Sequence, residues 1–145
     1  MGEPDHPIWE FVHSVECAVP REFAWGYWTN IANWIDPPAK FEISGPFTNG
    51  ARLSTILPGQ TYHSTIHSVV AGSSAAIEME LPGATLHFDW SFEDAGAKRT
   101  RIAQRVSLSG ANAEAFVAEA GAFERNLPGG MARLAAAMGK AYNFN

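Results

Sequence analysis

Two polar residues lie on otherwise apolar strand faces and could do chemistry. His13 shares one face of the alternating segment 8–19 with apolar and aromatic residues. Gln104 does the same within residues 98–109. A buried polar group without a partner costs about 1–3 kcal/mol, so each side chain needs either a protein partner or a ligand.

The two side chains suggest different roles. An imidazole titrates near neutral pH, which makes His13 the candidate catalytic residue as a general acid or base. The amide of Gln104 could bind a ligand carbonyl or hydroxyl. The alternative, which the sequence leaves open, is that the two residues bond each other or the backbone and have no further role.

Residues 61–71 carry a second set of candidates, on a segment with two mixed faces. If the face with Tyr62 and Ser64 is inside, Tyr62 is a donor to a ligand oxygen; if the other is inside, His63 and His67 line the pocket. Four residues on a strand span roughly 13 Å, so the two histidines cannot bind one metal ion together. Cys17 is the only cysteine, and no metal or cofactor site is predicted.

The acidic residues fall on the polar phase of the predicted strands or in turns. They are Glu10, Glu16, Glu42, Glu78, Glu80, Asp89, Glu93 and Asp94. A catalytic pocket usually pairs a base with an orienting carboxylate, so this pattern favours binding over proton transfer without excluding catalysis by His and Tyr. Three arginines, Arg99, Arg101 and Arg105, are expected on an ion-paired outer face of the sheet.

Composition narrows the class of protein. The 145 residues carry a net charge of −5, with 46% hydrophobic and 17% charged residues, which is typical of one globular domain over 1–145. Nucleic acid is not an expected partner, since phosphate binding requires an excess of Lys and Arg. Neither a signal peptide nor a membrane span is evident, and we expect a soluble cytoplasmic protein whose oligomeric state, including a homodimer through an open sheet edge, is left open.

The elements that must position these residues follow from alternation and turn residues. We expect a strand over 8–19, two short helices over 21–28 and 29–35, and then six strands in an antiparallel meander. The six strands are predicted at 41–44, 51–57, 61–71, 75–81, 84–94 and 98–109. Alanine-rich residues 112–142 form a last helix that Pro128-Gly129-Gly130 should kink or split, which gives an α+β architecture.

This order resembles the START-like (SRPBCC) superfamily, in particular its polyketide cyclase/dehydrase-like branch. The resemblance runs from about Glu10 to Met138 and rests on the phrases VPREFAWGYWTNIANW, TLHFDWSFEDAGAKRTRIAQRVSLSG and NLPGGMARLAAAM. Thr29-Asn30 stands where the family more often has an Asp. The resemblance implies a helix-grip fold, in which a curved seven-stranded antiparallel sheet wraps around the long C-terminal helix and two short helices close one end.

What the resemblance implies for function is broader, because the family has no single reaction. We expect a small apolar or amphipathic ligand in a cavity between sheet and helix; the alternatives are a cyclase or dehydratase and a co-chaperone-like interaction domain. Trp28 and Trp34 either plug one end of the fold or line the cavity. The predicted ligand-binding residues are Phe11, His13, Trp28, Trp34, Tyr62, Met79, Phe88, Trp90, Gln104, Phe116 and Phe123.

Overall fold

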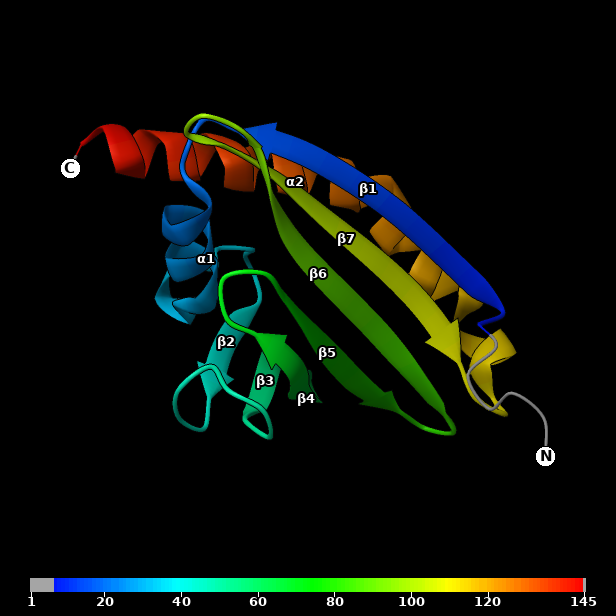
Figure 1. The fold of residues 1–145 in the computed structure, drawn as a ribbon. Coiled ribbons are helices and arrows are strands. Elements are labelled where there is room, and N and C mark those ends of the chain that lie inside the picture. Colours follow the sequence, from blue (N-terminus) through cyan, green and yellow to red (C-terminus); the bar gives the residue numbers. More distant parts are fainter. Residues whose placement is uncertain (1–6, 145) are drawn as a thin grey trace.

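Seven antiparallel strands form one curved sheet in the computed structural model, which describes residues 7–144 (Figure 1). Each predicted strand is present, and the alternation that predicted it separates an inner from an outer face. The strands are β1 (Trp9–Cys17), β2 (Lys40–Ile43), β3 (Arg52–Leu57), β4 (Gln60–Val70), β5 (Ser74–Leu81), β6 (Ala84–Gly96) and β7 (Arg99–Ser109). Their order across the sheet is β1-β7-β6-β5-β4-β3-β2, so β1 pairs with the last strand.

Two short helical segments connect β1 to the opposite edge of the sheet. The first, α1 (Arg21–Thr29), begins directly after Pro20. The second, η1 (Ile31–Asn33), is a single 3-10 turn that the Asn30 side chain caps by accepting from the Ala32 N–H at 3.1 Å. The helix predicted over 29–35 is therefore too long at its C-terminal end, where Trp34 leaves the turn and donates its Nε1–H to the Trp28 carbonyl at 2.6 Å.

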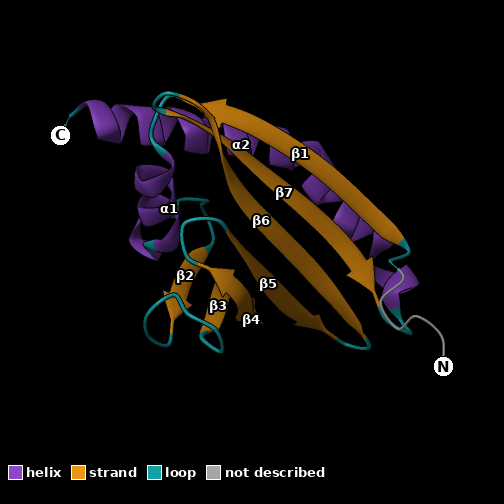
Figure 2. Cartoon of the chain, viewed as in Figure 1, coloured by secondary structure: helices purple, strands orange, loops and turns teal. Residues whose placement is uncertain are grey.

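The C-terminal segment forms η2 (Ala113–Phe116) and then one continuous helix, α2 (Val117–Asn143). Pro128 lies inside α2, so the expectation that the Pro-Gly-Gly sequence splits the helix is wrong. Figure 1 shows the helix axis changing direction along its length, which fits the kink that a proline causes by removing one backbone hydrogen bond. The helix lies closest to β1, on the inner side of the sheet (Figure 2).

The aromatic residues of α1 pack into the end of the sheet. Trp28 is 2% exposed, and its ring lies 4.9 Å from Phe47, 4.9 Å from Trp90 and 5.3 Å from Phe92, measured between ring centroids. Phe23 makes an edge contact with Tyr142 of α2 at 5.0 Å. These contacts tie α1 to both the sheet and the far end of α2.

A bulge in β4 explains why both faces of this strand look mixed in sequence. Ser64 and Ile66 are buried on the inner face, while the pairing with β5 shifts between His67 and Val70. Ser68 lies at a positive φ of 54° inside this irregularity. An extra residue in a strand inverts the phase of the side chains that follow, so Val69 packs against the core and Val70 is exposed.

Candidate ligand-binding site

Gln104 lies on the inner face, about halfway along β7, which is one strand in from the β1 edge of the sheet. Its Cα pairs with His13 of β1 on one side and with Trp90 of β6 on the other. The side chain is 3% exposed, and Oε1 is buried without a hydrogen-bond partner among the described residues. Since a buried acceptor without a donor is unfavourable, this atom marks where the protein alone does not satisfy its own polar groups.

The position of Gln104 divides the hydrophobic core. One cluster of buried residues, which includes Phe92 and Ile102, lies toward α1. A second, which includes Val106 and Leu108, lies toward η2. Gln104 falls between Ile102 and Val106 along β7, and the amide therefore interrupts an otherwise continuous apolar face.

Apolar side chains around this junction are half-buried rather than buried. Phe88 and Leu127 contact both clusters, and the Phe88 ring meets Phe123 of α2 edge-on at 5.6 Å. Trp90 and Met79 are also half-buried on the inner face. Solvent therefore reaches apolar surface between β5, β6 and α2, which is surface that a ligand could cover.

His13 lies beside this junction as predicted. Its ring stacks on Phe11 with centroids 6.4 Å apart, and it faces Gln104 across the β1–β7 pair without a hydrogen bond to any described residue. The acidic neighbours on β1, Glu10 and Glu16, are exposed on the opposite face. The imidazole therefore has no inward carboxylate to orient it, as the alternation indicates.

Tyr62 lies on the inner face of β4, which decides between the two faces considered for this strand. His63 and His67 lie on the outer face, where His67 Nε2 is 2.9 Å from Glu78 Oε1. Ser64, which lies with Tyr62 on one of the two candidate faces, is 1% exposed, and its Oγ has no hydrogen-bond partner among the described residues. Ser64 precedes the bulge and is in phase with Tyr62, so alternation groups the two but does not show which face of β4 points inward.

The remaining predicted residues occupy two regions. Trp28 belongs to the aromatic contacts that close the α1 end, and Trp34 is half-buried beside it with its ring 5.3 Å from Phe41. Phe116 lies at the other end of the fold, at the junction of η2 and α2, and packs against the second cluster. The structure therefore places Phe11, His13, Phe88, Trp90, Gln104 and Phe123 near one another, with the two tryptophans and Phe116 at the ends.

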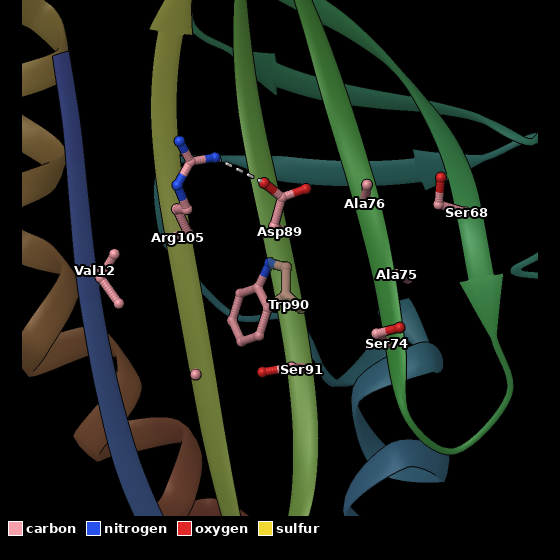
Figure 3. Close-up of a pocket in the computed structure, with 10 residues that line it drawn as sticks. Val12, Ser68, Ser74, Ala75, Ala76, Asp89, Trp90, Ser91 and Arg105 are labelled. Atoms are coloured by element: carbon pink, nitrogen blue, oxygen red, sulfur yellow. Dashed lines mark hydrogen bonds and ion pairs between the residues drawn. The ribbon is translucent and has the colours of Figure 1, made fainter. Parts of the chain in front are cut away.

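A hollow of about 340 Å³ lies on the outer face of the sheet, not between the sheet and α2 (Figure 3). Small side chains create it, among them Ser74, Ala76 and Ser91 on neighbouring strands. Arg105 and Asp89, at its rim, form an ion pair at 3.4 Å, drawn as a dashed line in Figure 3. The lining holds no buried polar atom that lacks a partner in the described part of the chain.

A second hollow of about 460 Å³ lies beside α1 and is lined by Phe23, Tyr27 and Asn33, among others. Neither hollow is enclosed by β6, β7 and the middle of α2. The cavity expected between the sheet and the helix stays a prediction, which the half-buried inner residues support.

The outer face of β7 is ion-paired, as expected from its arginines. Glu16 accepts hydrogen bonds from Arg99 at 2.8 Å and from Arg101 at 3.1 Å, and these bonds lower the pKa of the Glu16 carboxyl. Arg105 donates to Glu10 at 3.1 Å, which raises the pKa of the guanidinium. On the inner side, burial raises the pKa of the Cys17 thiol.

Within residues 7–144, His, Cys, Asp and Glu nowhere form a group of three that could hold a metal ion. The helices of that part of the chain include none that is long and apolar enough to cross a membrane.

Comparison with known proteins identifies the architecture. No family model matches the sequence, and no curated protein is similar to it. Among solved structures, a point mutant of norcoclaurine synthase from Thalictrum flavum aligns over 92% of this chain and 95% of its own, with 16% identity and a TM-score of 0.70. The Zhui aromatase/cyclase from a Streptomyces species aligns over 89% and 92%, with 19% identity and a TM-score of 0.70.

This chain has the helix-grip fold that these solved structures share. At these identities the likeness concerns the fold alone. In the helix-grip fold the inner face of the sheet lies toward the long helix, and here that face carries Gln104, His13 and the half-buried aromatic residues. The site residues are thus placed by the architecture, while their roles stay predictions.

Proposed function

We propose that this protein binds a small apolar or amphipathic molecule between the inner face of the sheet and α2. The observation that carries the proposal is the buried, unpartnered Oε1 of Gln104 among half-buried aromatic side chains. A ligand would cover the apolar surface and supply the missing hydrogen bond. Both gains favour the bound state, because apolar burial contributes about 25 cal/mol per Å² and a satisfied buried acceptor no longer carries a penalty.

Structures of the same fold support this proposal. Norcoclaurine synthase has been solved in complex with dopamine and hydroxybenzaldehyde, and it aligns over 89% of this chain with a TM-score of 0.68. These are small aromatic molecules with polar substituents, the class of compound that the aromatic surroundings of Gln104 would accommodate.

Native mass spectrometry tests the proposal directly. Purified protein should carry extra mass that disappears after denaturation, or it should bind the neutral fluorescent probe N-phenyl-1-naphthylamine with saturable enhancement of probe emission. The control is Ala103→Leu on the outer face, which should bind the probe as the wild type does. An apo mass together with no saturable probe binding would contradict the proposal.

A cyclase-type enzyme is the second candidate, favoured by the position of His13 beside Gln104 and by the fold shared with an aromatase/cyclase. Tyr62 lies far from His13 along the sheet, because β4 and β1 are four strand spacings apart in the sheet order, or about 19 Å along its surface. Catalysis would therefore depend on His13 as the single acid or base. Once a ligand is identified, its turnover by the wild type should fall about 100-fold or more in His13→Gln, while its affinity changes little; equal turnover by the two proteins would exclude this role.

A further inference from the structure

We infer that the ligand is an uncharged molecule whose hydroxyl or N–H group donates a hydrogen bond to Oε1 of Gln104. This inference rests on the proposed function and specifies the chemical class of the ligand. It is drawn from which atom of the amide is buried, from the distribution of charge around it, and from the shape of the neighbouring side chains.

The atom without a partner determines the complementary group. An amide oxygen only accepts hydrogen bonds, so with the amide in this orientation a ligand has to present a donor to it. His13 and Trp90 flank Gln104 in the sheet, but neither side chain donates a hydrogen bond to Oε1. A ligand lacking a donor would leave the acceptor buried and unpaired, and sites built around a hydrogen bond reject such analogues strongly.

The absence of charge on the inner face specifies a neutral ligand. Around Gln104 the inward positions of the described strands hold apolar residues, hydroxyls and His13, whereas most acidic and basic side chains lie on the outer phase. The exception is Asp94, at the far end of β6, which is exposed and ion-paired with Arg21 of α1 at 3.5 Å. On α2 the charged residues are exposed: Glu119, Glu124, Arg125, Arg133 and Lys140. A cationic ligand would be buried without a counter-charge, and an anionic ligand would have one only if His13 took up a proton. Burying either costs more than burying a neutral polar group.

The flanking side chains favour a flat aromatic molecule. Trp90 is the sheet neighbour of Gln104, Phe88 lies two residues along the same strand, and Phe123 meets Phe88 from α2. Aromatic rings pack well against a fused-ring ligand by offset or edge contacts. The expected ligand is therefore a phenol-like or arylamine-like compound.

A panel of four naphthalenes, titrated against the full chain by tryptophan fluorescence at pH 7, tests the inference. The compounds are 2-naphthol, 2-methoxynaphthalene, 2-acetonaphthone and 2-naphthoate, which are respectively a neutral donor, its capped ether, an acceptor and an anion. We expect 2-naphthol to bind about tenfold more tightly than the ether, the ketone or the anion. Gln104→Met should bind 2-naphthol and its ether within about twofold of each other, because the buried acceptor is gone.

Ser64→Ala is the matched control variant. It removes the other unpartnered buried polar atom of the inner face, which lies three strands from Gln104, and it should keep the tenfold preference for 2-naphthol. If far-UV circular dichroism shows that Gln104→Met does not fold, the affinities of the wild type and of Ser64→Ala for the four compounds decide whether a donor is preferred.

The outcomes separate this inference from the proposed function. Equal affinity of the wild type for 2-naphthol and its ether overturns the donor assignment and leaves ligand binding intact. Tighter binding of the ketone also overturns it, and tight binding of 2-naphthoate overturns the neutrality of the ligand. If none of the four compounds binds and N-phenyl-1-naphthylamine does not bind either, the proposed function fails together with the inference.

Discussion

At the scale of single residues, Gln104 is expected to lower the stability of the ligand-free protein. Its Oε1 is buried and unpaired, so Gln104→Met, which is similar in size and removes the polar group, should raise the free energy of unfolding by about 1–3 kcal/mol. Urea denaturation of the ligand-free protein measures this change. Gln60→Met, at an exposed position of β4, should change it by less than about 0.5 kcal/mol, and a destabilised Gln104→Met would show that the amide has a partner in solution.

Glu16 gives the stability of the fold a defined pH dependence. Hydrogen bonds from Arg99 and Arg101 lower its pKa in the folded state. The charged carboxyl therefore stabilises the protein above its ordinary pKa of about 4.3, and this contribution is lost as the pH falls through the lower folded value.

The measurement for Glu16 is urea denaturation of the wild type and Glu16→Gln between pH 2 and 7 at low salt. The wild type should be the more stable protein near pH 6, and the difference should vanish at the acidic end. Because the three side chains are exposed, 0.5 M NaCl should reduce the difference. A difference that grows as the pH falls would contradict the ion-pair explanation.

The sequence predicts part of the candidate site, and the reason is physical. His13 and Gln104 stand out because each interrupts a regular alternation, and they are paired in the β1–β7 ladder. Alternation places Ser64 with Tyr62 on one of two candidate faces of β4, and the choice between them stays open in the sequence because both faces mix polar and apolar residues. Alternation identifies a polar residue at an inward position only where the other residues of that face are clearly apolar, as on β1 and β7.

At the scale of elements, two glycines should respond to alanine in opposite directions. Gly139 lies inside α2, and a Cβ there would meet no atom within 4 Å, so Gly139→Ala should stabilise the protein by about 0.5–1 kcal/mol through helix propensity. Gly110 follows β7 at a φ of +116°, and a Cβ there would lie 2.8 Å from the Gly83 carbonyl oxygen. Gly110→Ala should therefore destabilise it by at least about 1 kcal/mol.

Thermal and urea unfolding of the two glycine variants distinguish these outcomes. Circular dichroism at 222 nm should show unchanged or higher helix content in Gly139→Ala. Loss of stability in that variant would mean that α2 needs flexibility near its C-terminal end.

Strands were easier to predict than the ends and bends of helices. Turn residues separate the strands in the sequence, and apolar and polar residues alternate along each strand. Together these two signals predict all seven strands. The extent of η1 depends on where Trp34 finds a hydrogen-bond acceptor, and the continuity of α2 through Pro128 depends on packing against β1 and α1. Both are tertiary effects that local propensity does not contain.

At the scale of the whole molecule, the inner and outer faces should differ in what added bulk does to binding. Leu127 contacts both core clusters from α2, so Leu127→Trp should occupy the space of a ligand and weaken binding of N-phenyl-1-naphthylamine by about tenfold or more. Ala103→Leu adds bulk to the outer hollow and should leave the affinity unchanged. Fluorescence titration of both variants is the measurement, and equal weakening by the two substitutions would place the probe outside the inner face.

The pairing of the first strand with the last also affects how the chain is made. Among the strands of residues 7–144, β1 pairs with β7 alone, from Cys17 opposite Thr100 to Trp9 opposite Leu108. At a translation rate of about 5–20 residues per second, the N-terminal strand waits on the order of 5–20 s after its own synthesis before β7 is complete. During that interval Trp9 and Phe11 have no sheet to cover them, so a ribosome that stalls before Ser109 leaves a nascent chain that cannot close its sheet and depends on chaperones to stay unaggregated.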